Sequence, residues 1–338
     1  MKSENSFTRL PEVNKINIFS EVATRKALPP VAIEKDWWVA VVLRALFSLP
    51  YAEHFSLKGG TSLSKCWNLI ARFSEDIDIA VNREFLGFSG TLSKTQISDR
   101  LRRSACSFVR EKLQFDLKKQ LEINDVDFNQ FSANVNITPI TTTDPEIIEI
   151  VYQSLFDDND YLKPVVKLEV SGRSMTEPLE RVMLSSFVGE VFPDLFISEK
   201  PFKVNVVVPE RTFLEKIFLL HEEFSKSQTF VRTERLSRHL YDLAQIANTA
   251  VAEKALKNTA LYESVVNHRR IFIGLKGFDY DSLSPGTINI IPPEDTIIHW
   301  QNDYEIMRKT MIYGQPLPFD KLIDTLKRMN QKINSMKL

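Results

Sequence analysis

The stretch that decides the fold runs from Lys58-Gly59-Gly60-Thr61-Ser62 to Phe73-Ser74-Glu75-Asp76-Ile77-Asp78-Ile79. Its first part is a glycine pair followed by two hydroxyl side chains, which is typical of a tight turn that opens a helix. Its second part alternates acids with isoleucines, which is typical of a strand with one buried face. We therefore expect a strand, a glycine turn, a helix, and a second strand that carries the acids.

This arrangement has the chemistry of a nucleotide site. Alternation places Asp76 and Asp78 on one face, about 7 Å apart along the strand, and two like charges there repel each other unless a cation lies between them. The N–H groups and the positive dipole at the start of a helix suit a phosphate group. The sequence therefore predicts that Lys58–Ser62 hold phosphate and that the two acids hold metal. For Ser74 two interpretations stay open, a phosphate ligand and a turn hydroxyl.

The composition is that of an ordinary globular protein. The 338 residues are 43% hydrophobic and 26% charged, and this length favours two domains. Because 43 Lys and Arg face 44 Asp and Glu, the net charge of −1 does not by itself indicate nucleic-acid binding. Cys66 and Cys106 lack metal-ligand spacing and fit a reducing compartment. The first ten residues are polar and no apolar run spans a membrane, so we expect a cytoplasmic protein.

Apolar spacing predicts an α+β fold with a mixed-sheet core, flanking helices and a C-terminal helical lobe. Helices are expected over 11–26, 31–48, 61–70, 95–122 and 178–191, and strands over 54–57, 76–81, 125–138, 147–155, 165–170 and 203–208. Beyond Pro209 the pattern is helical. We therefore expect a core domain over residues 1–208 and a helical domain over residues 209–338.

A third acid stands in a later apolar strand. Glu169 alternates with Val166, Leu168 and Val170, and an unpaired acid there is costly. A bound cation or a pairing with Lys167 would explain the presence of Glu169 in this strand. The alternative is that Glu169 lies on an edge strand and faces water. Sites for two-metal phosphoryl transfer need carboxylates that bridge two cations, so Asp76, Asp78 and Glu169 could form such a set.

The helical region adds two candidates. Lys216 lies on a strongly apolar helix and could neutralise phosphate charge, although a surface lysine is the alternative. Asp242 also lies on a mostly apolar helix; the alternative there is a buried acid paired with an arginine such as Arg238. His221 and His239 lack ligand spacing and are interpreted as structural. The same holds for Trp37-Trp38, which we expect in the core.

The spacing from Gly59-Gly60-Thr61-Ser62 to Asp76-Ile77-Asp78 resembles the signature of the DNA polymerase-β-like nucleotidyltransferases. More narrowly, the chain resembles the AbiEii/AbiGii toxin family, the toxin half of type IV toxin–antitoxin and abortive-infection systems. Six further stretches share this resemblance: Glu34-Lys35-Asp36-Trp37-Trp38, Arg72-Phe73-Ser74-Glu75-Asp76-Ile77-Asp78-Ile79, Val166-Lys167-Leu168-Glu169-Val170, Thr212-Phe213-Leu214-Glu215-Lys216, Arg238-His239-Leu240-Tyr241-Asp242-Leu243, and a tail with Asp303-Tyr304, Met307 and Met311-Ile312-Tyr313-Gly314. The glycine turn is not a P-loop, because no Gly-Lys-Ser/Thr follows at the required spacing.

The resemblance implies a nucleotidyltransferase-like fold and a Mg²⁺-dependent enzyme that transfers NMP from an NTP. Two Mg²⁺ would be held by Asp76, Asp78 and Glu169, Lys216 would contact the triphosphate, and Asp242 would complete the catalytic site. The resemblance also implies an RNA acceptor, with the tRNA 3′ end as the favoured example, a block of translation, and a cognate antitoxin. The family often shows Arg-Asp where this chain has Arg238-His239.

Two other functions stay open at this point. The enzyme could transfer the nucleotide to a small molecule or a protein, as other members of the fold do. The chain could also bind NTP or a partner without turnover, although the intact set of Asp76, Asp78 and Glu169 argues against that. A basic surface beside the acids would favour RNA, and a closed acidic site would favour a small cationic acceptor.

Overall fold

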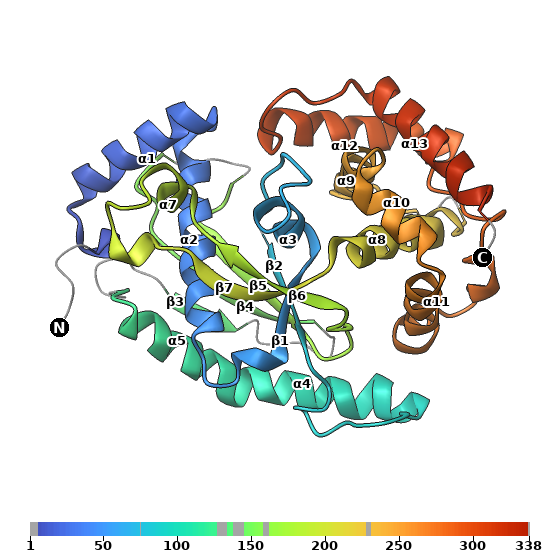
Figure 1. The fold of residues 1–338 in the computed structure, drawn as a ribbon, viewed down its shortest axis with the longest axis horizontal. Helices are drawn as coiled ribbons and strands as arrows, with labels where there is room; N and C mark the ends of the chain where they lie inside the picture. The colour runs from blue at the N-terminus through green and yellow to red at the C-terminus, as the bar shows by residue number, and fades with distance from the viewer. Residues whose placement is uncertain are drawn as a thin grey trace. The chain divides into compact units, whose positions relative to one another are not determined.

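The computed structural model describes residues 6–74, 76–126, 134–137, 145–157, 162–227 and 231–336. The chain forms two compact units (Figure 1). The first comprises Met1–Cys66 and Phe73–Val207, and the second comprises Trp67–Arg72 and Val208–Leu338. The chain therefore passes from one unit to the other after Cys66, after Arg72 and after Val207.

A seven-stranded mixed sheet forms the centre of the first unit, in the order β3-β4-β5-β2-β1-β7-β6. The strands are β1 (Phe55–Lys58), β2 (Asp76–Val81), β3 (Asn134–Ile137), β4 (Glu146–Val151), β5 (Val165–Ser171), β6 (Leu179–Leu184) and β7 (Phe202–Val207). The pairs β1·β7 and β2·β5 are parallel, and the other neighbours are antiparallel. This confirms the predicted α+β class.

Alternation along β2 and β5 separates a buried face of the sheet from a half-buried one. Ile77 and Ile79 are at most 1% exposed, whereas Asp76 and Asp78 are half-buried, and β5 follows the same pattern. Helix α2 (Pro30–Phe47) packs against β5 and β7, with α1 (Glu12–Lys26) and α7 (Phe187–Val191) beside it. Burial of these apolar side chains stabilises the unit by roughly 1.5–3 kcal/mol per large residue.

Polar side chains near the start of α2 are buried together with the tryptophans. Glu34 accepts hydrogen bonds from the Ser154 hydroxyl and the Leu155 amide, at 2.5 and 2.9 Å. Asp36 binds Lys65. Trp37 and Trp38 are 1% and 2% exposed, which confirms them as core residues. The charged residues here hold segments of the unit together.

A long helical segment is built from η3 (Gln96–Leu101), α4 (Arg102–Phe108), η4 (Val109–Leu113) and α5 (Gln114–Ile123). Its buried residues, Leu101, Val109, Leu113, Leu117 and Leu121, follow helical spacing, as predicted for residues 95–122. Of the strand predicted over 125–138, residues 134–137 form β3, and Phe128 and Phe131 lie outside the described residues.

The helix predicted over residues 178–191 is wrong. Residues Leu179–Leu184 form β6, which pairs antiparallel with β7 so that Val182 lies opposite Val204, and only Phe187–Val191 are helical. β6 is an edge strand whose Leu179 and Met183 are exposed, so no clear alternation marks it in the sequence. Pairing with a strand some twenty residues later overrides the local helical preference.

The turn between β1 and α3 (Gly59–Lys65) depends on Gly59. This residue has φ = +73°, and a Cβ there would lie 2.9 Å from Cγ of Asp78 and closer still to its Oδ2. The Thr61 hydroxyl donates to the Asp76 carbonyl at 2.5 Å, and the Ser62 hydroxyl donates to the Gly59 carbonyl at 2.9 Å. Helix α3 ends at Lys65, short of the predicted 61–70, because the residues after Cys66 join the second unit.

The second unit is helical. Its helices are α8 (Pro209–Phe224), α9 (Ser237–Ile246), α10 (Ala250–Lys257), α11 (Thr259–His268), α12 (Ile297–Thr310) and α13 (Phe319–Asn334). Helix α8 contacts α9, α10 and α11, and its core residues Phe213, Leu214, Ile217 and Phe218 are fully buried. Pro209 at the first helical position favours the start of α8. Among the described residues, no helix is long and apolar enough to cross a membrane.

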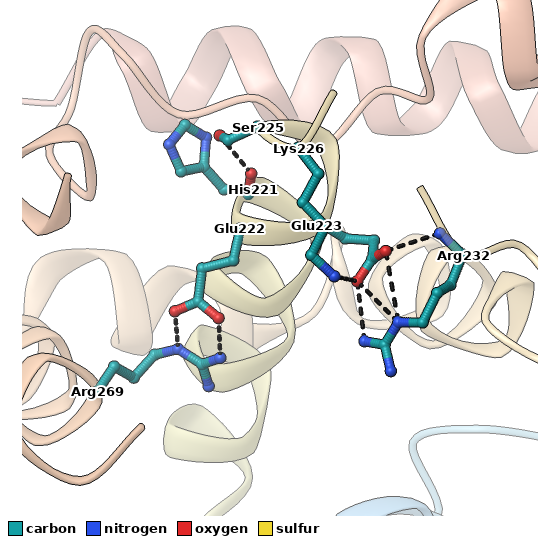
Figure 2. A network of polar contacts seen from close by, with 7 residues as sticks. All are labelled: His221, Glu222, Glu223, Ser225, Lys226, Arg232 and Arg269. Carbon is teal, nitrogen blue, oxygen red and sulfur yellow. Dashed lines mark hydrogen bonds and ion pairs between the residues drawn. The ribbon is translucent and has the colours of Figure 1, made fainter. Parts of the chain in front are cut away.

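Two consecutive acids near the end of α8 bind arginines on different sides of the helix (Figure 2). Glu222 forms a two-point ion pair with Arg269, whose Nε lies 2.6 Å from Oε1. Glu223 binds Arg232 and Lys226 at 2.8 and 2.6 Å. Glu222 and Arg269 form a buried pair, and loss of one partner from such a pair costs about 3–5 kcal/mol.

We predict that Gly59→Ala lowers the free energy of unfolding by about 3 kcal/mol, because it combines an unfavourable positive φ with a clash against Asp78. Gly87→Ala is the matched control. Gly87 has φ = +87° but nothing within 4 Å of an added Cβ, so we expect a loss of about 1 kcal/mol. Urea unfolding of both variants measures the difference. Equal losses would show that the contact with Asp78 is unimportant.

Candidate active site

Two of the three predicted acids lie side by side in the sheet. β2 and β5 are parallel, and their register places Asp78 opposite Glu169 and Asp76 opposite Lys167. Register partners on adjacent strands point to the same face of a sheet. Asp76, Asp78 and Glu169 therefore share the half-buried face of the first unit, as the sequence predicts.

Basic residues flank these acids. Lys58 on β1 is the register partner of Asp78 on the side opposite Glu169. Lys167 lies opposite Glu149 of β4, and its Nζ is 3.7 Å from Glu149 Oε1. β5 lies between β4 and β2, so the alternative of an edge-strand charge at Glu169 is wrong. The face presents acids with lysines on either side.

The donor set suits a hard divalent cation. Asp76, Asp78 and Glu169 offer only carboxylate oxygens, the ligands that Mg²⁺ prefers. Across the described part of the chain, no three His, Cys, Asp or Glu side chains, these three acids included, lie together so that they could hold a metal ion as a group. Mg²⁺ commonly binds through one or two carboxylates together with substrate phosphates and water. The pair Asp78 and Glu169 fits that kind of binding.

The residues predicted to hold phosphate surround the turn before α3. Thr61 and Ser62 are at most 1% exposed, and their hydroxyls bind backbone carbonyls. Lys58 Nζ donates to the Ser174 hydroxyl at 3.2 Å. Ser74 is half-buried just before β2. The two hydroxyls therefore shape the turn, and they bring its backbone close to Asp78.

In the second unit, Asp242 is completely buried and forms three charge-assisted hydrogen bonds. Arg72 donates through Nε at 2.7 Å and through Nη2 at 2.8 Å, and Lys216 Nζ lies 2.9 Å from Oδ2. The sequence suggested Arg238 as the arginine partner of a buried Asp242, whereas the partner is Arg72, 170 residues earlier. Burial raises the pKa of Asp242, but Arg72 and Lys216 outweigh it and hold the pKa well below its usual range.

Lys216 and Asp242 contact each other, which the sequence did not specify. Lys216 is 6% exposed and also lies 3.1 Å from Nδ1 of His239. Burial lowers the pKa of the ammonium group, and the neighbouring Arg72 adds to this, while Asp242 opposes it. One helical turn earlier, the buried Thr212 hydroxyl has no hydrogen-bond partner among the described residues. Lys216 is thus a buried cation fixed by two neighbours.

The two histidines have structural contacts, in line with the sequence interpretation. Nδ1 of His221 accepts from the Asn289 amide at 2.9 Å, and Nε2 lies 3.1 Å from the Ser282 hydroxyl. Burial holds the pKa of His239 well below its usual value, and the positive charges of Lys216 and Arg238 lower it further. A neutral His239 can accept a hydrogen bond from Lys216 through Nδ1.

Arg72 is the residue that the site prediction missed. Its neighbour Ala71 accepts from the Tyr313 amide at 2.9 Å and donates to the Tyr241 hydroxyl at 3.3 Å. Arg72 itself forms an antiparallel bridge with Ile312. Arg72 opens the stretch of residues 72–79 that shares the family resemblance, but the sequence did not indicate that its partner is the acid in the apolar helix.

We predict that stability falls as the pH drops below about 6.5, since the unfolded chain then binds a proton that folded His239 does not. The slope from this group is at most about 1.4 kcal/mol per pH unit. In His239→Asn the amide oxygen can still accept from Lys216, and we expect a flatter pH dependence. His299→Gln, which changes an exposed residue on α12, is the control and should keep the wild-type slope. Urea unfolding at about pH 5.5 to 7.5, which brackets the free histidine pKa, gives the slope of the unfolding free energy against pH for each variant. Identical slopes for His239→Asn and wild type would contradict this role of His239.

No curated protein sequence matches the chain. Among solved structures, the chain is similar to MenT4, a nucleotidyltransferase toxin from Mycobacterium tuberculosis H37Rv, with 16% sequence identity and a TM-score of 0.43. That match covers 96% of this chain and 97% of MenT4.

A family model gives the decisive match. The model described as nucleotidyl transferase AbiEii toxin, type IV TA system, matches residues 41–325, which include β2, β5, α8 and α9. The match therefore spans the acids of the sheet as well as Lys216 and Asp242. With most of its length accounted for in this way, the chain belongs to the AbiEii family of type IV toxin–antitoxin systems and is a nucleotidyltransferase.

Proposed function

We propose that this toxin transfers NMP from an NTP to an RNA acceptor in a Mg²⁺-dependent reaction and thereby blocks translation. The observation that carries the proposal is the register of β2 and β5, which pairs Asp78 with Glu169 on a half-buried face. Family membership supplies the reaction class and the NTP substrate, and a toxin of a type IV system has a cognate antitoxin. The acceptor, the ion and the residue roles are the proposed parts.

Asp76, Asp78 and Glu169 are the proposed metal ligands, and two ions are proposed to bind. When bound, Mg²⁺ supplies positive charge that activates an acceptor hydroxyl and stabilises the leaving pyrophosphate. The carboxylate of Asp78 packs against Gly59, so its position is fixed by the turn. This close approach supports a shared role for the turn and the acids, because phosphate held by the turn would lie near the metal ligands.

Gly59, Gly60, Thr61 and Ser62 are proposed to hold the triphosphate through the backbone of the turn, with Lys58 and Ser74 beside it. Lys216 is proposed to contact the triphosphate, and Asp242 to hold Lys216 in place. Two of the three N–H groups of Lys216 are directed to Asp242 and His239, and the third can donate to a phosphate oxygen.

Two lysines beside the acids support an anionic acceptor. Lys58 and Lys167 are the register neighbours of Asp78 and Asp76. Positive side chains at these positions can contact a phosphate backbone. Together with the sequence resemblance, this supports RNA and the tRNA 3′ end as the favoured acceptor.

The assay that tests this proposal is incubation of the protein with each labelled NTP in turn, with Mg²⁺ and total cellular RNA. We expect one NTP to label RNA in the size range of tRNA, and chelation of the metal to abolish labelling. Asp76→Ala, run in parallel, should label nothing. Label in protein or in a small molecule would replace RNA as the acceptor, and equal labelling by Asp76→Ala would overturn the site.

We predict that Asp78→Asn lowers kcat for transfer at least about 10³-fold, because it removes a negatively charged metal ligand without changing the shape of the side chain. Glu149→Gln is the matched control on the same sheet, since it alters a carboxylate that faces Lys167 rather than the metal ligands. We expect this variant to stay within about 3-fold of wild type. Comparable losses in both variants would mean that general surface charge, rather than metal binding, explains the effect.

A further inference from the structure

Arg72 and Phe73 are adjacent in sequence, but each is anchored in a different unit. Arg72 closes the segment Trp67–Arg72 of the second unit, and Phe73 opens the segment Phe73–Val207 of the first. Phe73 is 6% exposed and packs in a buried cluster with Ala32 and Leu162. The chain therefore crosses between the units at one peptide bond whose two residues are both held.

The anchor at Arg72 is the stronger of the two. Its guanidinium is 2% exposed and donates two parallel hydrogen bonds to the Asp242 carboxylate. This two-point geometry makes an arginine–carboxylate pair both strong and directional. Its backbone is bridged to Ile312. Burial opposes the positive charge, but Asp242 outweighs it and raises the pKa of Arg72.

The acids follow Arg72 at short range. Asp76 lies four positions after Arg72, which is at most about 14 Å of extended chain. The other restraint at the start of β2 is the hydrogen bond from the Thr61 hydroxyl to the Asp76 carbonyl. Arg72 therefore restrains the short segment that leads into β2, and a 1 Å misplacement at a reacting centre can cost about 100-fold in rate.

We propose that Arg72 is a positioning residue for nucleotidyl transfer. Its ion pair with Asp242 fixes the segment that leads into β2, and thereby the metal-binding geometry of Asp76 and Asp78. The inference rests on the proposed metal site. It gives Asp242 a role that its complete burial allows, since a carboxylate covered by Arg72 and Lys216 acts through those neighbours.

The test compares two buried arginines of the second unit. Arg72→Gln breaks the pair with Asp242, and Arg269→Gln breaks the similar two-point pair with Glu222 shown in Figure 2. Both variants should lower the unfolding midpoint. Only Arg72 lies at the entry of β2, so a merely structural role predicts the same enzymatic effect for both variants.

Two measurements are made at a temperature at which circular dichroism shows every variant folded. The first is kcat and KM for the NTP in the transfer reaction. The second is the affinity for Mn²⁺, read from the electron paramagnetic resonance signal of the free ion. We expect Arg72→Gln to lower kcat about 100-fold with little change in KM, and to weaken Mn²⁺ binding about 10-fold. We expect Arg269→Gln to leave both within about 3-fold of wild type.

Equal effects of the two substitutions, or an unchanged Mn²⁺ affinity in Arg72→Gln, would overturn the proposal. If Arg72→Gln does not fold, Arg72→Lys is tested in its place. The lysine keeps the positive charge beside Asp242 but cannot form the two parallel hydrogen bonds of the guanidinium. Wild-type kcat and Mn²⁺ affinity in Arg72→Lys would also overturn the proposal. Asp76→Asn separates this outcome from failure of the proposed function. If Asp76→Asn binds Mn²⁺ with wild-type affinity, the proposed metal site is wrong. If Asp76→Asn binds Mn²⁺ weakly and Arg72→Gln binds it normally, the metal site stands and only the proposed role of Arg72 is wrong.

Discussion

The candidate site depends on the parallel pairing of β2 with β5 in one register. Glu169 lies opposite Asp78 only in this register, and a slip of one residue would move it to the buried face, where the sheet holds Leu168 and Val170. The apolar residues on that buried face therefore disfavour a one-residue slip, because that slip would bury the acids and expose apolar side chains. Core packing and site geometry are consequences of the same alternation, and the turn at Gly59, which packs against Asp78, fits this arrangement.

The second unit handles charge differently, since it buries ion pairs inside a helical core. Asp242, Arg72 and Lys216 are each at most 6% exposed, and such a group is tolerated because three charge-assisted hydrogen bonds replace those lost to water. A buried ion pair is weak evidence for stability by itself, because desolvation can exceed the attraction between the charges. Arg72 lies four positions before β2, so the proposed use of this pair is to hold the chain in place rather than to add stability.

Much of the fold could be predicted from the sequence, because alternation in β2 and β5 and helical spacing in α8 report local burial directly. The pattern failed at β6, whose exposed Leu179 and Met183 carry no alternation, since its strand conformation is imposed by pairing with β7. Asp76, Asp78 and Glu169 could be named as candidates because acids among buried apolar neighbours are costly. The partner of Asp242 could not, because helical spacing pointed to Arg238, four residues away, while the real contact joins residues 170 apart. A long-range pair of this kind leaves no periodic signal in one sequence.

Asp78 and Glu169 are proposed to bind a divalent metal ion together with the nucleotide. The most direct test is the anomalous scattering of Mn²⁺ in crystals grown with a non-hydrolysable NTP analogue. We expect an anomalous peak within coordination distance of both carboxylates, about 2.0–2.6 Å, and beside the phosphates. A peak bound elsewhere in the protein, or an analogue bound away from β2 and β5, would contradict it.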